Sequence, residues 1–544
     1  MKFNYTAQNL SVEEYKWQRF FEILPGLTSW LIIVGLVVLT IFQPILGACG
    51  VIALMLYWIL RLSYLTIFLL ISFFRFSMEK EIDWLALAHL ASGTGDMSRS
   101  NRTRKGLRAF KYRLAYLLHK KEIEQLRKNT QPVPSMDKLI HLVMIPIVNE
   151  PSQILEQSIQ SLAGGSFSAK QLLVVLAVEE RSSQTIQENA IRLQKRFQKY
   201  FYDFKIIVHP DGIPGEAKVK GANVTFAAKK MAAYFNEKGI QYENVILSCF
   251  DADTVVDPQY FACLTYQFLV CPDRLQSSFQ PVPVYTNNIW QAHGFTRVLE
   301  MGASFFQLIE ATNPEKLVTF SSHSMSFKVL ADINYWPVDM ISDDSSIFWK
   351  AFIYYDGHYQ AVPLYVTVSM DVVDAGSWWR TAVNVYKQKR RWAWGIENFP
   401  IILRAFMKAE QISFYDKFRY AFKMFESHVS WATWAFILSF VGWVPALLAS
   451  RTFSETVLYY TAPRITHLIL NLSLGALIVS IILSLLMLPK RKVKHSFLKK
   501  TGFTLQWFLL PWTFIFLGAL PALDAQTRLM FGKYMTFWVT EKKR

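Results

Sequence analysis

Long apolar runs lie near both ends of the chain. Between residues 23 and 74 the only charged residue is Arg61, and the Gln43-Pro44 pair divides this run into two segments. Three more charge-free runs follow much later, at 429–450, 465–489 and 501–523. Each is close to the ~20 residues that a helix needs to cross a bilayer, and five such runs are uncommon as buried core helices. The pattern predicts five membrane-spanning helices in two blocks.

Between these blocks the hydrophobic pattern changes to short apolar runs bounded by turns. Helical patterns that begin at Glu150 and Ser183 separate the first three runs, and alternation of this kind predicts a parallel sheet with crossover helices. The predicted strands are 139–148, 171–178, 204–210 and the strand that begins the run 244–253. We therefore expect a soluble α/β domain over about 139–410.

Composition and charge agree with a membrane protein. The chain has 544 residues, of which 52% are hydrophobic and 18% charged, and this excludes a disordered protein. The four cysteines show no zinc-ligand spacing and do not suggest a disulfide-stapled scaffold. Clusters of Lys and Arg at 102–128 and 490–500 predict that the central domain and the 490–500 loop are cytoplasmic.

The net charge of +17 suggests an anionic partner. No nucleic-acid recognition motif accompanies the basic stretch 102–128, so nucleic acid is not expected as a partner. We expect this stretch to be a solvated helix or one that faces lipid headgroups. Membrane lipids are then the partner of most of the excess charge.

These features divide the chain into six parts. We expect a cytoplasmic N-terminal segment (1–22), a two-helix membrane hairpin (23–75) and a basic linker (76–138). The α/β domain (139–410) follows, with interface helices to about 426, and then a membrane region of about three spans (427–523) and a tail (524–544). Five crossings would leave the basic tail outside. A re-entrant last segment, bent near Leu520-Pro521, would return it to the cytoplasm, and both arrangements stay open.

Acidic and polar residues follow the predicted strands. Asn149-Glu150, Glu179-Glu180 and Asp251-Ala-Asp253 each come at a strand end, which is where parallel sheets bind their ligands. Two carboxylates one residue apart can approach a hard divalent cation that bridges phosphate oxygens. Alone, such a triplet also fits a solvated turn.

Five motifs occur in an order that resembles a known family. They are IPIVNE, KVKGAN, FDADT, ISDDSSIFW and QKRRW, at 145–150, 218–223, 250–254, 341–349 and 388–392. In this order they resemble the family 2 glycosyltransferases, in particular the membrane-embedded branch with cellulose, chitin and hyaluronan synthases. The resemblance covers about 139–395. It implies a GT-A (Rossmann-like) α/β catalytic domain in the cytoplasm, inserted between transmembrane helices, and metal-dependent inverting transfer from a UDP- or GDP-sugar.

The resemblance also implies roles for donor-side residues. Asp253 would bind Mg²⁺ or Mn²⁺, and Asp251 would contact the metal or the nucleotide ribose. Glu150 and Glu179 would lie at the base and ribose end. Near the diphosphate the resemblance places Lys220, with Lys218 as its competitor, and Asn223. Structural roles remain open for two of these residues, a helix N-terminal carboxylate for Glu150 and a surface lysine for Lys220.

Asp344 would be the catalytic base, with Asp343 as its rival. The family's Thr-Glu is Ser342-Asp343 in this chain, which shortens the neighbouring acid by one methylene. The first motif has Val148 where a tyrosine is common, so stacking on the base would have to come from elsewhere.

The last motif contributes one residue to the donor side and two to the acceptor side, and one histidine is assigned to the acceptor. By resemblance, Arg391 would clamp the diphosphate, Trp392 would stack on the acceptor sugar and Gln388 would hold the geometry. An amphipathic interface helix is the alternative for this motif. His323 would contact the acceptor, or would be a structural histidine.

These inferences favour a processive polysaccharide synthase coupled to export, in a prokaryotic cytoplasmic membrane. The alternatives are a transferase that adds one sugar to a lipid-linked acceptor, and an inactive membrane scaffold or export partner. A homo-oligomer or an export partner is also possible.

Overall fold

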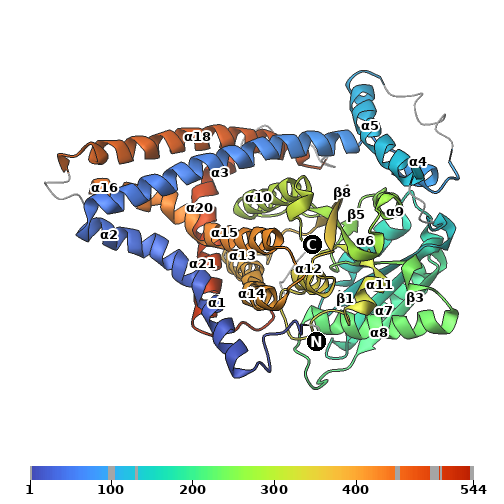
Figure 1. The fold of residues 1–544 in the computed structure, drawn as a ribbon. Helices are drawn as coiled ribbons and strands as arrows, with labels where there is room; N and C mark the ends of the chain where they lie inside the picture. The colour runs from blue at the N-terminus through green and yellow to red at the C-terminus, as the bar shows by residue number, and fades with distance from the viewer. Residues whose placement is uncertain are drawn as a thin grey trace.

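The computed structural model describes residues 3–95, 105–128, 133–447, 454–489, 502 and 505–538. The basic 490–500 loop and the EKKR tail, which were used above to predict the membrane topology, lie outside these residues. An α/β domain occupies one side of the molecule, and long helices from both ends of the chain extend from it (Figure 1).

The domain is built on one mixed sheet of eight strands in the order β3-β2-β1-β4-β7-β6-β8-β5. Neighbouring strands run parallel from β3 to β4, whereas β7 is antiparallel to both β4 and β6. The strands are β1 Ile140–Ile147, β2 Leu172–Glu179, β3 Asp203–His209, β4 Val245–Cys249, β5 Val255–Val256, β6 Ser277–Tyr285, β7 Ser324–Ser326 and β8 Gln360–Met370. The four strands predicted from the sequence are confirmed.

Both faces of the sheet are covered, because the central strands are apolar on both sides. Along β1, Val143 and Ile145 pack into a core with α6, α7 and α9, whereas Leu142 and Met144 pack into a second core with α8, α11 and α12. The helices are α6 Ser152–Ala163, α7 Gln184–Phe197, α8 Lys220–Lys238, α9 Tyr260–Val270, α10 Gly294–Ala311, α11 Phe327–Asp332, α12 Asp343–Tyr354, α13 Trp378–Ala393 and α14 Asn398–Lys408.

Four helical segments of the described residues are long and apolar enough to cross a membrane: Val12–Phe42, Pro44–Glu79, Tyr459–Met487 and Gln506–Met530. The first contains α1 Val12–Trp30, the π-turn η1 Leu31–Gly35 and α2 Leu36–Phe42, and the second is α3. The third lies within α18 Val457–Met487, and the fourth contains α20 Leu510–Phe514, η12 Ile515–Ala519 and α21 Leu520–Met530. In Figure 1, α3 and α18 run side by side.

The predicted span at 429–450 is wrong. Its first half belongs to α15 (Phe414–Ser439), a helix whose N-terminal part carries charged residues that pair with the α/β domain, such as Lys423 with Glu310. The helix ends at Phe440, and only a short turn and α16 (Val444–Leu447) follow. For the last segment, where two arrangements were open, the helical run continues through Leu520-Pro521, with the π-helix η12 immediately before them.

Both chain ends contact the rest of the molecule. The arm before α1 reaches the α/β domain, where the Tyr5 hydroxyl donates to Asn398 Oδ1 (2.5 Å). After α21, the Tyr534 hydroxyl donates to the Glu22 carboxylate (3.0 Å). Arg61, the charge inside the second apolar run, pairs with Glu426 of α15, so a local salt bridge accounts for it.

Two helices, α4 Trp84–Ala91 and α5 Leu107–Lys128, connect α3 to the domain.

Candidate active site

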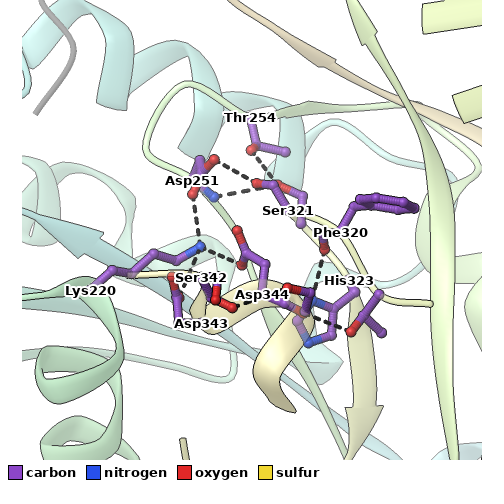
Figure 2. Close-up of polar contacts among 12 residues, drawn as sticks. Lys220, Asp251, Thr254, Phe320, Ser321, His323, Ser342, Asp343 and Asp344 are labelled. Carbon is purple, nitrogen blue, oxygen red and sulfur yellow. Dashed lines mark hydrogen bonds and ion pairs between the residues drawn. The ribbon is translucent and has the colours of Figure 1, made fainter. Parts of the chain in front are cut away.

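A lysine with a side chain only 11% exposed lies at the centre of the candidate site. The Nζ atom of Lys220 is 2.9 Å from Asp251 Oδ1, 2.7 Å from Asp344 Oδ1 and 3.7 Å from Asp343 Oδ2. Figure 2 shows the ammonium group between the three carboxylates. The structure therefore brings together residues of three separate sequence motifs.

The fold explains why these side chains meet. Lys220 is the first residue of α8, Asp251 follows the carboxyl end of β4, and Asp343 and Asp344 form the first turn of α12. Acidic residues are favourable at a helix N-terminus, where backbone N–H groups carry partial positive charge, whereas a lysine there is not. The contacts with three carboxylates offset the unfavourable interaction of the Lys220 ammonium group with the N-terminus of α8.

Burial shapes the electrostatics of the cluster. Burial alone would lower the pKa of Lys220, but Asp251, Asp344 and Asp343 outweigh it and hold the pKa well above its ordinary value. Burial and the neighbouring Asp344 raise the pKa of Asp343 to about 7, although Lys220 opposes the shift. The lysine is therefore charged at neutral pH, and Asp343 titrates near neutrality.

The segment before β7 forms another wall of the site. Ser321 Oγ donates to Asp251 Oδ2 (2.5 Å), and Thr319 Oγ1 donates to the Asp344 carbonyl oxygen (2.6 Å). Ser322 is buried in the left-handed region at φ +63°, a conformation that costs free energy in a residue with a side chain. This strained segment thus holds the Asp251 side chain through Ser321 and the Asp344 backbone through Thr319.

His323 is buried behind this wall. Its Nδ1 is 2.9 Å from the Phe320 carbonyl oxygen, so the N–H lies on Nδ1 and Nε2 keeps its lone pair. Burial lowers the pKa of His323, which keeps the imidazole neutral. Nε2 has no hydrogen-bond partner among the described residues, so a buried acceptor is left unused beside the site.

Asp253 lies deeper than Asp251. Its Oδ2 accepts a hydrogen bond from the Asp371 N–H (2.8 Å), and its carbonyl oxygen accepts one from Asn287 Nδ2 (2.9 Å). No group of three or more His, Cys, Asp or Glu side chains suited to a metal ion occurs within the described residues. Magnesium commonly binds through one or two carboxylates and completes its shell with phosphate oxygens and water, so Asp251 and Asp253 fit such a shared site.

A glutamate that the sequence did not single out fixes the start of α12. Glu397 Oε1 accepts hydrogen bonds from the Ser342 N–H (2.9 Å) and hydroxyl (2.6 Å), and Oε2 accepts one from Trp394 Nε1 (2.8 Å). Asn398 Nδ2 donates to the same Ser342 hydroxyl (2.9 Å). The turn after α13 therefore positions the helix that carries Asp343 and Asp344.

Several predicted site residues lie apart from the lysine cluster. Lys218 is exposed and pairs with Asp211 (2.9 Å). The buried Asn223 side chain donates to the Ala177 carbonyl oxygen of β2 (2.8 Å). Glu150 accepts hydrogen bonds from the backbone N–H groups of Val148 and Asn149 in the turn after β1, and it does not cap α6. Of the two lysines of the KVKGAN motif, only Lys220 is brought to Asp251.

Glu179 belongs to a second, neighbouring pocket at the ends of β2 and β3. It is buried and pairs with Arg181. The loop between β3 and α8 forms the other side of this pocket, whose lining includes His209, Asp211, Gly212 and Lys218.

The residues of the QKRRW motif lie on the last turns of α13. Trp392 is half-buried, with the Lys389 ammonium 3.5 Å from its ring centre and Tyr285 at a centroid distance of 5.6 Å. Gln388 is buried, and Arg391 packs against Phe537 with a centroid distance of 5.3 Å. One face of Trp392 is therefore covered by Lys389, which in turn pairs with the buried Glu300 (2.8 Å).

No family model and no curated protein matches this sequence. Solved structures with similarity to the fold include a mannosyltransferase from Pyrobaculum calidifontis in complex with GDP-Man and Mn²⁺, at 12% identity and a TM-score of 0.37 over 72% of this chain and 99% of that one. They also include residues 1–349 of S. aureus TarS, at 12% identity and a TM-score of 0.34 over 63% of this chain and 90% of that one. GalNAc-T7 with UDP, GalNAc and Mn²⁺ matches at 9% identity and a TM-score of 0.33, over 62% and 69%. With values this low, the function has to be inferred from the site of this chain.

Proposed function

We propose that this protein is a membrane-embedded, inverting glycosyltransferase of the GT-A kind that uses a UDP- or GDP-sugar from the cytoplasm. The observation that carries the proposal is the contact of Lys220 with both Asp251 and Asp344. This contact brings three groups together: a cation suited to a diphosphate, a carboxylate of the Asp251-Ala-Asp253 (DxD) triplet, and a carboxylate suited to general base catalysis. The order of the sheet strands and the order of the sequence motifs also support the proposal.

Asp344 is the base in this proposal. Its side chain is 27% exposed, compared with 6% for Asp343, so an acceptor hydroxyl can reach it. Asp344 removes the proton from this hydroxyl, whose oxygen attacks the anomeric carbon as the bond to the nucleoside diphosphate breaks. The ion pair with Lys220 holds the Asp344 carboxylate in place before the acceptor arrives. Because a diphosphate offers Lys220 other anionic partners, donor binding would release Asp344 for catalysis.

The donor diphosphate would lie against Lys220 and the DxD triplet. Asp251 and Asp253 would hold Mg²⁺ or Mn²⁺ together with diphosphate oxygens, and the ion supplies charge neutralisation of the leaving group. Arg391 is the second cation assigned to the diphosphate. The pocket lined by Glu179 is assigned to the nucleoside end of the donor.

The acceptor side is assigned to Trp392, Gln388 and His323. The face of Trp392 that Lys389 leaves open would stack on a sugar ring. His323 Nε2 would accept a hydrogen bond from an acceptor hydroxyl, because it is a buried acceptor with no partner among the described residues. The association of the site with apolar helices favours a processive synthase coupled to export over a single addition to a lipid-linked acceptor.

The experiment is a turnover assay on the full chain in lipid nanodiscs with UDP- and GDP-sugars and Mn²⁺. Replacing Lys220 with Met should abolish turnover, whereas Lys238→Met is the matched control and should keep most of it, since Lys238 is exposed at the other end of the same helix, α8. Long polymer would identify a synthase, and a single-sugar glycolipid would identify the alternative transferase. Absence of turnover with every donor, or equal turnover in the Lys220 variant, would contradict the proposal.

A further inference from the structure

Helix α5 has two apolar faces, and only one of them is covered. Five residues of the covered face are buried: Tyr112, Ala115, His119, Ile123 and Leu126. The other face exposes Leu107, Phe110, Leu117 and Leu118 at 67%, 53%, 55% and 38%. Since an α-helix turns by 100° per residue, these four side chains share one side, away from the buried residues.

Buried polar contacts hold the covered face in place. His119 Nε2 is 2.8 Å from Glu79 Oε2 at the end of α3, and its Nδ1 is 3.0 Å from Glu122 Oε2. The Tyr266 hydroxyl of α9 donates to Glu122 (2.8 Å). Burial by itself lowers the pKa of His119, but the two carboxylates raise it to about 9, so the histidine is charged and paired at neutral pH. These contacts attach α5 to the end of α3 and keep its apolar outer face from turning inward.

The outer face also lies among positive charges. Helix α5 contains seven Lys or Arg residues and two glutamates, and one of these glutamates, Glu122, is engaged by His119 and Tyr266. Arg113, Lys120 and Lys121 are exposed. Exposed apolar residues among basic residues are the pattern of helices that lie in the interface of anionic membranes.

The position of α5 agrees with this chemistry. It is attached to the end of α3, a helix long and apolar enough to cross a membrane. In Figure 1, α5 lies across the direction of α3 instead of continuing it. A helix that lies in the plane of a bilayer has this orientation relative to a helix that crosses it.

We propose that the outer face of α5 docks on the anionic surface of the bilayer that α3 enters. The lysine and arginine side chains would contact the lipid headgroups, and Leu107, Phe110, Leu117 and Leu118 would enter the interface. Because the covered face contacts α9 of the α/β domain, this docking would fix the domain relative to the membrane. The proposal does not depend on the transferase assignment.

The test uses the full chain in nanodiscs, with an environment-sensitive fluorophore on Leu117→Cys. The exposed Cys49 is first replaced by Ser, since the other three cysteines are buried. A matched control carries the label at Ile191→Cys on α7, which is apolar and 46% exposed but belongs to the α/β domain. Nanodiscs contain phosphatidylcholine alone, or phosphatidylcholine with about 30% phosphatidylglycerol, and a trace of nitroxide-labelled lipid as quencher.

We expect the nitroxide lipid to quench the label at 117 at least roughly two-fold more than the label at 191. Quenching at 117 should be stronger in the anionic nanodiscs than in those of phosphatidylcholine alone. The triple variant Arg113→Glu, Lys120→Glu and Lys121→Glu should lose the difference between the two lipids while the label at 191 is unchanged. Equal quenching at both positions would overturn the proposal. A blue-shifted label at 117 without quenching would also overturn it, because a protein surface would then cover the helix.

Discussion

Glu397 accepts two hydrogen bonds from Ser342, one from its backbone N–H and one from its hydroxyl. This pair links the turn after the QKRRW helix to the residue immediately before Asp343 and Asp344. The Glu397 side chain does not contact Lys220 or Asp251, so its influence on the candidate site is through position.

Replacing Glu397 with Ala should therefore lower turnover with little effect on donor affinity. The change leaves the Ser342 N–H without its acceptor, and an unpaired buried donor costs about 1–3 kcal/mol. Glu397→Gln keeps one acceptor oxygen and should retain more activity than the alanine variant. Parallel measurement of kcat and of UDP affinity checks this expectation, and loss of both in the two variants would indicate a purely structural role.

Asp344→Asn keeps the shape of the side chain and removes its basicity. We expect UDP binding to persist while transfer falls by about 10²–10⁴-fold, the usual contribution of a general base. Asp343→Asn is the matched control and should reduce transfer much less. Single-turnover assays on both variants distinguish them, and the opposite order would move the base to Asp343.

Asp343 should make the stability of the protein depend on pH. Its pKa is raised in the folded state, from an ordinary value of 3.8 to about 7, so the folded state binds the proton more tightly than the unfolded state. Its contribution to stability is therefore present at low pH and is lost as the pH rises towards 7. The thermal midpoint of Asp343→Asn relative to the unmodified protein should increase between pH 5 and pH 8. A constant difference across this range would contradict the raised pKa.

Removal of Asp253 should leave a folded protein that no longer turns over the nucleotide sugar. Replacing Asp253 with Ala removes one of the two oxygen ligands assigned to the divalent ion. We expect activity to be lost at every Mn²⁺ concentration, whereas chelation should abolish activity of the unmodified protein reversibly. Unchanged activity of the variant, or activity of the unmodified protein in excess chelator, would exclude the metal assignment.

Trp392→Ala separates an acceptor platform from a packing role. If Trp392 stacks on the acceptor, transfer should collapse while UDP affinity is kept, because the diphosphate contacts are assigned to Lys220, Arg391 and the metal. Slow hydrolysis of the donor by water should continue. A packing role alone would lower expression and UDP binding together, because removal of the half-buried ring leaves a cavity. Both quantities can be measured on one preparation.

The α/β domain could be predicted well because its signals are local. Apolar runs such as 139–148 and 171–178 must be strands once helices separate them, and carboxylates after a parallel strand must lie at one edge of the sheet. The choice of Asp251 and of Lys220 followed from motif order, and the structure brings these residues together. Their chemical roles remain predictions.

The residues that sequence reasoning missed act across long separations. Glu397 contacts Ser342 across 55 positions, and Ser321 contacts Asp251 across 70, so no local periodicity could reveal them. The false span at 429–450 has a different cause. Counting charges finds an apolar run but does not show that α15 begins 15 residues earlier, with charged side chains that bind the α/β domain, and ends at Phe440.

The contacts of the two chain ends limit how many times the chain can cross a bilayer. Tyr5, before α1, touches Asn398 of α14 in the α/β domain, and α3 leads into the same domain, so the helices from α1 to α3 must begin and end on the same side. Tyr534, after α21, touches Glu22 near the start of α1, and Gln18, one turn before Glu22, accepts a hydrogen bond from Arg404 of α14. The helices between α14 and Tyr534 must therefore also return to the side on which they began. An even number of crossings follows for each block, and five crossings in total are incompatible with these contacts.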